Sequence, residues 1–128
     1  MNKNTLHRFL VVDDFSLIRR WIRESLMSMG FHNVDEAPNG IEALEKLHLN
    51  HYALVITDWN MPLMSGIELI ENIKHKPELA HLPILMITTE QDQEHISEAL
   101  TTGADEYLIK PFSQEALRDS IERLVIQS

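Results

Sequence analysis

Short apolar runs alternate with amphipathic stretches along the whole chain. Four of the runs are uninterrupted by polar residues and are partly β-branched, and a fifth is weaker. In chain order they are Phe9–Val12, Val34–Ala37 (the weaker one), Tyr52–Ile56, Ile84–Ile87 and Tyr107–Ile109. Runs of this kind are typical of parallel strands that are buried on both faces. The pattern therefore predicts five strands.

An amphipathic stretch follows each run, with apolar residues three and four positions apart, as in a helix packed on one face. These stretches are Ile18–Met29, Ile41–His48, Ile67–Lys74, Ile96–Leu100 and Leu117–Val125. Boundary signals agree with them. Ser65 and Glu68 have the spacing of a capping box, and Ser113 is suited to cap the last helix. Gly30 and Gly103 follow two of the stretches, where a left-handed residue often ends a helix.

The order of the elements is thus a strand followed by a helix, repeated five times. Such an order predicts the α/β class, with a doubly wound parallel sheet and helices on both faces. The length of 128 residues suits one domain. We expect residues 1–128 to form a single domain with no separate output domain.

Composition narrows the classes of function. The chain has no cysteine, which excludes disulfide scaffolds, thiolate metal sites and a cysteine nucleophile. Its 11 Lys and Arg residues against 20 Asp and Glu residues give a net charge of −9, which argues against nucleic acid and anionic membranes as partners. No apolar stretch approaches the ~20 residues of a membrane helix, and the first run is too short for a signal peptide. We therefore expect a cytoplasmic protein.

Polar side chains stand where four of the five predicted strands end. Asp13 and Asp14 follow the first strand, Asp58 the third, Thr88 the fourth and Lys110 the fifth. Because ligands bind outside the carboxyl ends of the strands in open α/β sheets, we expect these groups to converge on one edge. Any one of them alone has an ordinary explanation. The Asp pair could form a turn or a helix cap, and a single Asp or Lys could be a solvated loop charge.

Together, these groups suggest phosphoryl-transfer chemistry. Each close pair of carboxylates costs on the order of 1–4 kcal/mol in repulsion, and one lysine cannot neutralise three of them. Mg²⁺ suits such a set because it binds carboxylates, waters and phosphate oxygens. A lysine then suits an incoming phosphoryl group, and an Asp is a known phosphoryl-accepting nucleophile. The sequence therefore predicts Mg²⁺-assisted phosphoryl transfer to a carboxylate.

The residues around these positions resemble the receiver domain of two-component response regulators. The matching segments run in order along nearly the whole chain: Val11–Asp14, Ile56–Pro62, Ser65-Gly66, Met86–Thr88 and Tyr107–Phe112. Within the family, the chain is most similar to the single-domain, CheY-like chemotaxis type. The resemblance implies a flavodoxin-like sheet in the order 2-1-3-4-5, and a stand-alone regulator that acts as a monomer.

The resemblance also implies a role for each matching site residue. Asp58 is the expected phosphoacceptor. Mg²⁺ is expected to bind Asp14, Asp58 and the backbone carbonyl of Asn60 directly, and Asp13 through a water. Lys110 is expected to contact the phosphoryl group.

The implied switch consists of Thr88, which hydrogen-bonds the phosphoryl group after transfer, and Tyr107, which changes rotamer. A strand aromatic with no such role is the alternative for Tyr107. The surface expected to respond is the fourth helix, fifth strand and fifth helix. The bond between Lys110 and Pro111 is expected to be cis, as in the family.

The implied partners are a histidine kinase as phosphodonor, a downstream protein that could be the flagellar motor switch protein, and a phosphatase. A phosphate sink or a phosphorelay shuttle in another two-component pathway is the alternative. Asn60 and Glu90 match the chemotaxis type, which implies self-catalysed loss of the phosphoryl group.

Two departures from the family pattern bear on these expectations. Thr89 replaces a smaller residue beside the site, and Asp92-Gln93 replaces lysines that help flagellar proteins to dock.

Two other classes fit less well. A phosphatase of the haloacid dehalogenase type places its nucleophile after the first strand with a second Asp two residues on, whereas residue 60 is Asn. A flavin carrier needs a Ser-, Thr- or Gly-rich phosphate loop after the first strand, where Asp13 and Asp14 would repel the phosphate. The seven histidines have no zinc-like spacing on the strand ends, so we expect them at the surface: His7, His32, His48, His51, His75, His81 and His95.

Overall fold

The computed structural model describes residues 7–126. Its elements are β1 (Arg8–Val12), α1 (Ser16–Ser28), β2 (Asn33–Ala37), α2 (Gly40–Leu49), β3 (Leu54–Asp58), α3 (Gly66–Lys74), β4 (Ile84–Thr88), α4 (Gln93–Thr102), β5 (Glu106–Ile109), α5 (Gln114–Ile121) and the π-helical turn η2 (Glu122–Ile126). All neighbouring strands are parallel, and their order is β2-β1-β3-β4-β5. The predicted α/β class and flavodoxin-like order are confirmed.

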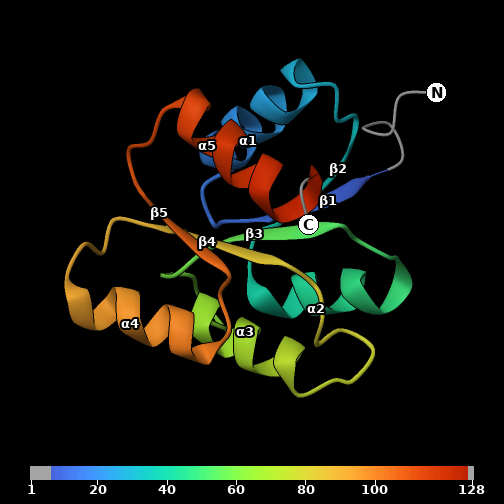
Figure 1. The fold of residues 1–128 in the computed structure, drawn as a ribbon. Helices are drawn as coiled ribbons and strands as arrows, with labels where there is room; N and C mark the ends of the chain where they lie inside the picture. Colours follow the sequence, from blue (N-terminus) through green and yellow to red (C-terminus); the bar gives the residue numbers. More distant parts are fainter. Residues whose placement is uncertain (1–6, 127–128) are drawn as a thin grey trace.

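The sheet separates two layers of helices. Figure 1 shows α1 and α5 on one face and α2, α3 and α4 on the other. Alternate residues of β1 point to the two sides. Phe9 and Val11 pack with α1 and α5, whereas Leu10 and Val12 pack with α2, α3 and α4. The uninterrupted apolar runs are therefore explained, because both faces of a central strand are covered.

The prediction of burial on both faces is correct for the three central strands and wrong for the edges. Every residue of β5 is only half-buried, and within the predicted run Val34–Ala37 the side chains of Asp35 and Glu36 in β2 are only partly buried. Each edge strand has a neighbour on one side only. The third strand also differs from its prediction, since it covers Leu54–Asp58 rather than Tyr52–Ile56. The polar residues Thr57 and Asp58 are buried and continue its pairing into the site.

Helix boundaries follow the predicted signals closely. Ser65 and Glu68 form both hydrogen bonds of the capping box of α3, and the Ser113 side chain accepts from Ala116 N at the start of α5. Gly30 and Gly103 have φ angles of 97° and 140°, the region that glycine adopts without penalty.

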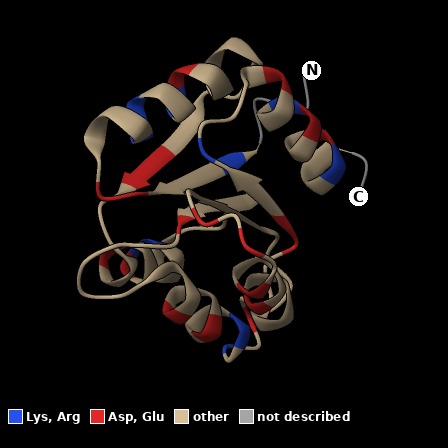
Figure 2. Cartoon of the chain, turned by 90° about the vertical axis from the view of Figure 1, so that its left-hand side faces the viewer, with Lys and Arg blue, Asp and Glu red and all other residues tan. Residues whose placement is uncertain are grey.

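The carboxyl ends of the five strands lie at one edge of the molecule, the left-hand side of Figure 1. Figure 2 looks onto this edge and shows acidic segments in the loops near its centre. The parallel register brings Val12 beside Thr57, and Asp58 beside Ile87. Residues that follow β1 and β3 are thus held near each other. None of the helices within residues 7–126 has the length and apolar character that a bilayer crossing requires.

Candidate phosphoryl-acceptor site

Three carboxylates meet at the carboxyl edge beyond β1 and β3. Asp13 and Asp14 follow β1, and Asp58 is the last residue of β3. Each offers a carboxylate oxygen, and these three oxygens lie within 4.8 Å of one another. Asp13 and Asp58 are buried, whereas Asp14 is exposed, so the cluster is open to solvent on one side. The structure thus brings together the three acids that the strand ends point to.

Lys110 reaches into this cluster from the segment that follows β5. Its Nζ lies 2.9 Å from Asp13 Oδ2 and 3.4 Å from Asp58 Oδ1. The bond between Lys110 and Pro111 is cis, as expected. One ammonium group balances only part of the negative charge. Burial, followed by repulsion from Asp13, raises the pKa of the Asp58 carboxyl to about 6, although Lys110 and the Trp59 N–H act against this rise.

Asp13 also forms the turn that the sequence offered as an ordinary explanation for the Asp pair. Its Oδ1 accepts a hydrogen bond from the backbone N–H of Phe15 at 2.9 Å, which fixes the turn into α1. Its Oδ2 accepts from Lys110. The residue therefore shapes the turn and belongs to the acidic cluster at the same time.

The loop from β3 to α3 holds Asp58 in position. Asp58 Oδ1 accepts from the N–H of Trp59 at 2.8 Å. Gly66 N donates to Trp59 O at 2.8 Å, which folds the loop back over the end of β3. Ser65 then caps α3, so the loop is anchored at both of its ends.

Glu90 links the predicted switch residues to the loop after Asp58. Its N–H donates to Thr88 Oγ1 at 3.2 Å, and its C=O accepts from the Tyr107 hydroxyl at 2.7 Å. Its side-chain Oε1 accepts from Asn60 Nδ2 at 3.4 Å. Thr88 is fully buried, Tyr107 is half-buried and Asn60 is exposed. All three residues therefore contact a single neighbour at the rim of the site.

Both departures from the family pattern lie next to the site. Thr89 is exposed and lines a pocket of about 470 Å³ together with Lys110, Trp21 and Phe112. Asp92 is the N-cap of α4, where its side chain accepts from the backbone N–H of His95.

The sequence did not indicate a place for His95 in this region. Five of the seven histidines are exposed as expected, whereas His7 and His95 are partly buried. The imidazole of His95 lies against the indole of Trp59, with the ring centroids 4.9 Å apart. The signal that could have identified it is the spacing of Asp92 and His95, which are an N-cap and the third residue of its helix.

Comparison with known proteins agrees with this geometry. The model of the response regulator receiver domain matches residues 9–122. The chain is 44% identical over 124 residues to chemotaxis protein CheY-3 of Vibrio cholerae serotype O1, covering 97% of this chain and 94% of that protein. It is 42% identical over 117 residues to chemotaxis protein CheY of Pseudomonas aeruginosa, covering 91% and 94%.

A solved structure of similar shape is that of chemotaxis protein CheY4 of Vibrio cholerae. Its TM-score is 0.86 at 35% identity, and the match covers 92% of this chain and 98% of that one. This solved structure shares the fold, and it and both curated relatives match most of the length of the chain. The chain therefore belongs to the response regulator receiver domain family.

Proposed function

We propose that Asp58 accepts a phosphoryl group from the phosphohistidine of a histidine kinase, and that the phosphorylated domain then binds a downstream protein. The observation that carries this proposal is the crowding of Asp13, Asp14 and Asp58 around one partly open point, with Lys110 beside them. The domain is a signalling module, and the transfer chemistry takes place on its own side chains.

The donor set fits Mg²⁺. Three carboxylates, those of Asp13, Asp14 and Asp58, lie together there. The backbone carbonyl of Asn60, in the loop after β3, is the further ligand that the family resemblance implies. Hard oxygen ligands with a net negative charge are what this cation prefers. When bound there, Mg²⁺ offsets the charge of the carboxylates and of the phosphoryl oxygens.

The chain's own residues account for the transfer step. Within residues 7–126, the hydrogen bond and the ion pair of the Asp58 carboxylate both use Oδ1, which leaves Oδ2 for attack on phosphorus. The bond from Oδ2 to phosphorus forms as the bond from phosphorus to the donor imidazole nitrogen breaks. The imidazole leaves with that electron pair and takes up a proton. Lys110 lies close enough to Asp58 to contact a phosphoryl oxygen and offset its charge.

Thr88 and Tyr107 would carry the signal away from Asp58. A hydrogen bond from Thr88 to a charged phosphoryl oxygen is worth about 1.5–3 kcal/mol, which is enough to shift a two-state equilibrium roughly ten- to 150-fold. Thr88 Oγ1 already contacts the N–H of Glu90, and Tyr107 contacts the C=O of the same residue. A movement of Thr88 therefore displaces Glu90, and with it the surface formed by α4, β5 and α5.

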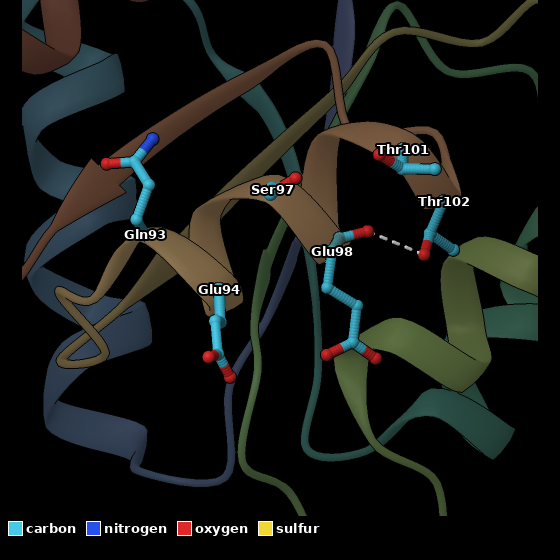
Figure 3. Close-up of a pocket in the computed structure, with 6 residues that line it drawn as sticks. All are labelled: Gln93, Glu94, Ser97, Glu98, Thr101 and Thr102. Atoms are coloured by element: carbon cyan, nitrogen blue, oxygen red, sulfur yellow. Dashed lines mark hydrogen bonds between the residues drawn. The ribbon is translucent and has the colours of Figure 1, made fainter.

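The exposed face of α4 bears on the choice of partner. It forms a shallow pocket, drawn in Figure 3, lined by Gln93, Glu94, Ser97, Glu98, Thr101 and Thr102. The helix contains no Lys or Arg, and Asp92 adds a carboxylate at its N-cap. Charges of this sign repel an acidic docking segment. We propose a chemotaxis role, which the relatives support, with a partner whose contact surface is neutral or basic. The acidic face also favours the alternative of a phosphate sink or phosphorelay shuttle.

Phosphorylation by acetyl phosphate with Mg²⁺, followed by intact mass and site mapping, tests the acceptor. We expect one phosphoryl group on Asp58 in the parent and in Asp119→Asn, which changes an exposed acid on α5. We expect none in Asp58→Asn. Stable incorporation at residue 58 in that variant would refute the assignment.

The metal and the partner are tested separately. Millimolar Mg²⁺ is expected to change the fluorescence of Trp59 in a Trp21→Phe background, because Trp59 adjoins the cluster.

For the partner, a pull-down with and without beryllofluoride compares a motor-switch peptide with whole lysate. Capture of the peptide only with beryllofluoride supports motor control, and capture of another phosphotransfer protein supports the shuttle.

A further inference from the structure

His95 joins the start of α4 to the loop that follows Asp58. Its ring meets the indole of Trp59 edge-on, at an interplanar angle of 66°. Its Nδ1 lies 2.5 Å from Asp92 Oδ1, and because a carboxylate only accepts hydrogen bonds, Nδ1 carries a proton. Its Nε2 lies 3.7 Å from Oε2 of Glu90. One imidazole thus contacts the β3–α3 loop, the β4–α4 loop and the cap of α4.

The contact with Glu90 gives His95 a route to the site. Glu90 uses its other carboxylate oxygen to accept from Asn60, and its backbone contacts Thr88 and Tyr107. A contact that holds the Glu90 side chain therefore also affects Asn60, Thr88 and Tyr107 beside the proposed acceptor.

In the described part of the chain, the charged groups that act on His95 are carboxylates. Asp92 and Glu90 come from the cap and the preceding loop, and Glu98 comes from α4 itself, while Trp59 contributes a neutral ring from the opposite loop. The hydrogen bond to Asp92, together with the charges of Glu90 and Glu98, raises the pKa of the His95 imidazole above its usual value. A cationic imidazole here offsets part of the charge of Glu90.

We propose that His95 is a positioning residue, which holds the Glu90 carboxylate toward α4 and offsets its charge beside the entrance to Asp58. The inference rests on the proposed function, because the effect it assigns is on phosphoryl transfer. Among residues 7–126, the Glu90 carboxylate without His95 keeps only its contact with Asn60, and it repels an incoming phosphoryl anion. His95 thereby sets how readily a phosphodonor reaches the acceptor.

The contact itself can be measured without phosphorylation. The pH dependence of Trp59 fluorescence is recorded without metal in a background of two substitutions. Trp21→Phe removes the other tryptophan, and Asp58→Asn removes the titrating carboxyl next to Trp59. We expect a transition centred above pH 6.5, the ordinary histidine value. It disappears in His95→Gln, moves toward 6.5 in Asp92→Asn and is unchanged in the control His32→Gln. The same transition in His95→Gln would overturn the proposal.

The effect on transfer is measured with acetyl phosphate and Mg²⁺. We expect His95→Gln to slow phosphorylation about two- to fivefold, the size of an exposed ion-pair effect. In a Glu90→Gln background, the same change of His95 is expected to have no further effect. An equal loss in both backgrounds, or no loss in either, would show that His95 does not act through Glu90. Failure of the parent protein to take up phosphate would instead refute the proposed function, so the two failures are distinguishable.

Discussion

Gly66 packs directly on the backbone of Asp58. A Cβ atom at residue 66 would lie 2.2 Å from the carbonyl oxygen of Asp58 and 3.0 Å from Cα of Trp59. Neither atom can move without moving the end of β3. The first residue of α3 is therefore in van der Waals contact with the strand end that carries the proposed acceptor, and only glycine leaves room for that contact.

This contact predicts that Gly66→Ala destabilises the protein, by about 1–3 kcal/mol as in other overpacked sites. The sign of this stability change is informative, because replacing a helical glycine by alanine normally stabilises a protein. Gly40→Ala, at the start of α2, is the matched control, since the three atoms nearest to its Cβ would belong to the Met64 side chain rather than to backbone. Urea unfolding of both variants measures the difference. An unchanged midpoint for Gly66→Ala would contradict the packing described.

The residues at the strand ends were predictable because a parallel sheet leaves few choices. Once Asp13 follows one central strand and Asp58 ends its neighbour in a five-stranded α/β sheet, the register brings the two residues together. The contacts of His95 could not be predicted in this way. They depend on the path of two loops and on the cap of α4, for which strand and helix patterns carry no information. The partial exposure of the edge strand β5 was not predicted either, because the run Tyr107–Ile109 is uninterrupted by polar residues, like the runs of the central strands.

Asp58→Asn is expected to stabilise the metal-free protein at neutral pH. The pKa of Asp58 is raised from 3.8 to about 6 in the folded state, so the folded protein binds this proton more tightly than the unfolded chain does. The free energy of unfolding therefore falls as pH rises from about 4 to 6 and stays lower above that range. The amide removes this loss, by at most about 3 kcal/mol. Chemical unfolding at pH 4 and pH 7.5 measures the stability gained by Asp58→Asn, with Glu45→Gln at an exposed position as the control. A gain of equal size at both pH values would argue against a titrating carboxyl.

The hydroxyl of Tyr107 is expected to ionise only at a higher pH than an ordinary tyrosine. Burial, followed by the charges of Glu90 and Asp92, raises its pKa to about 12. Since the unfolded chain ionises near pH 10, the folded protein keeps this proton longer, and its stability falls as pH rises from about 10 to 12. Tyrosinate absorbance measures the ionisation, and Tyr107→Phe isolates the other tyrosine, Tyr52. Full tyrosinate absorbance at pH 10.5 in the folded protein would contradict the partial burial of Tyr107 beside Glu90 and Asp92.

Replacing Lys110 by glutamine is expected to separate metal binding from phosphoryl chemistry. The ammonium lies 2.9 Å from Asp13 and 3.4 Å from Asp58, so it competes with a divalent cation for the same carboxylates. Its removal should tighten Mg²⁺ binding about three- to tenfold, given the interaction of charges at this distance in partly screened surroundings. The same variant should respond less to beryllofluoride, because the Lys110 ammonium group is no longer there to contact the phosphoryl position. Trp59 fluorescence in the Trp21→Phe background reports both effects, with Lys76→Gln as a control remote from the cluster. Weaker Mg²⁺ binding in Lys110→Gln would mean that the ammonium organises the acids rather than competing for them.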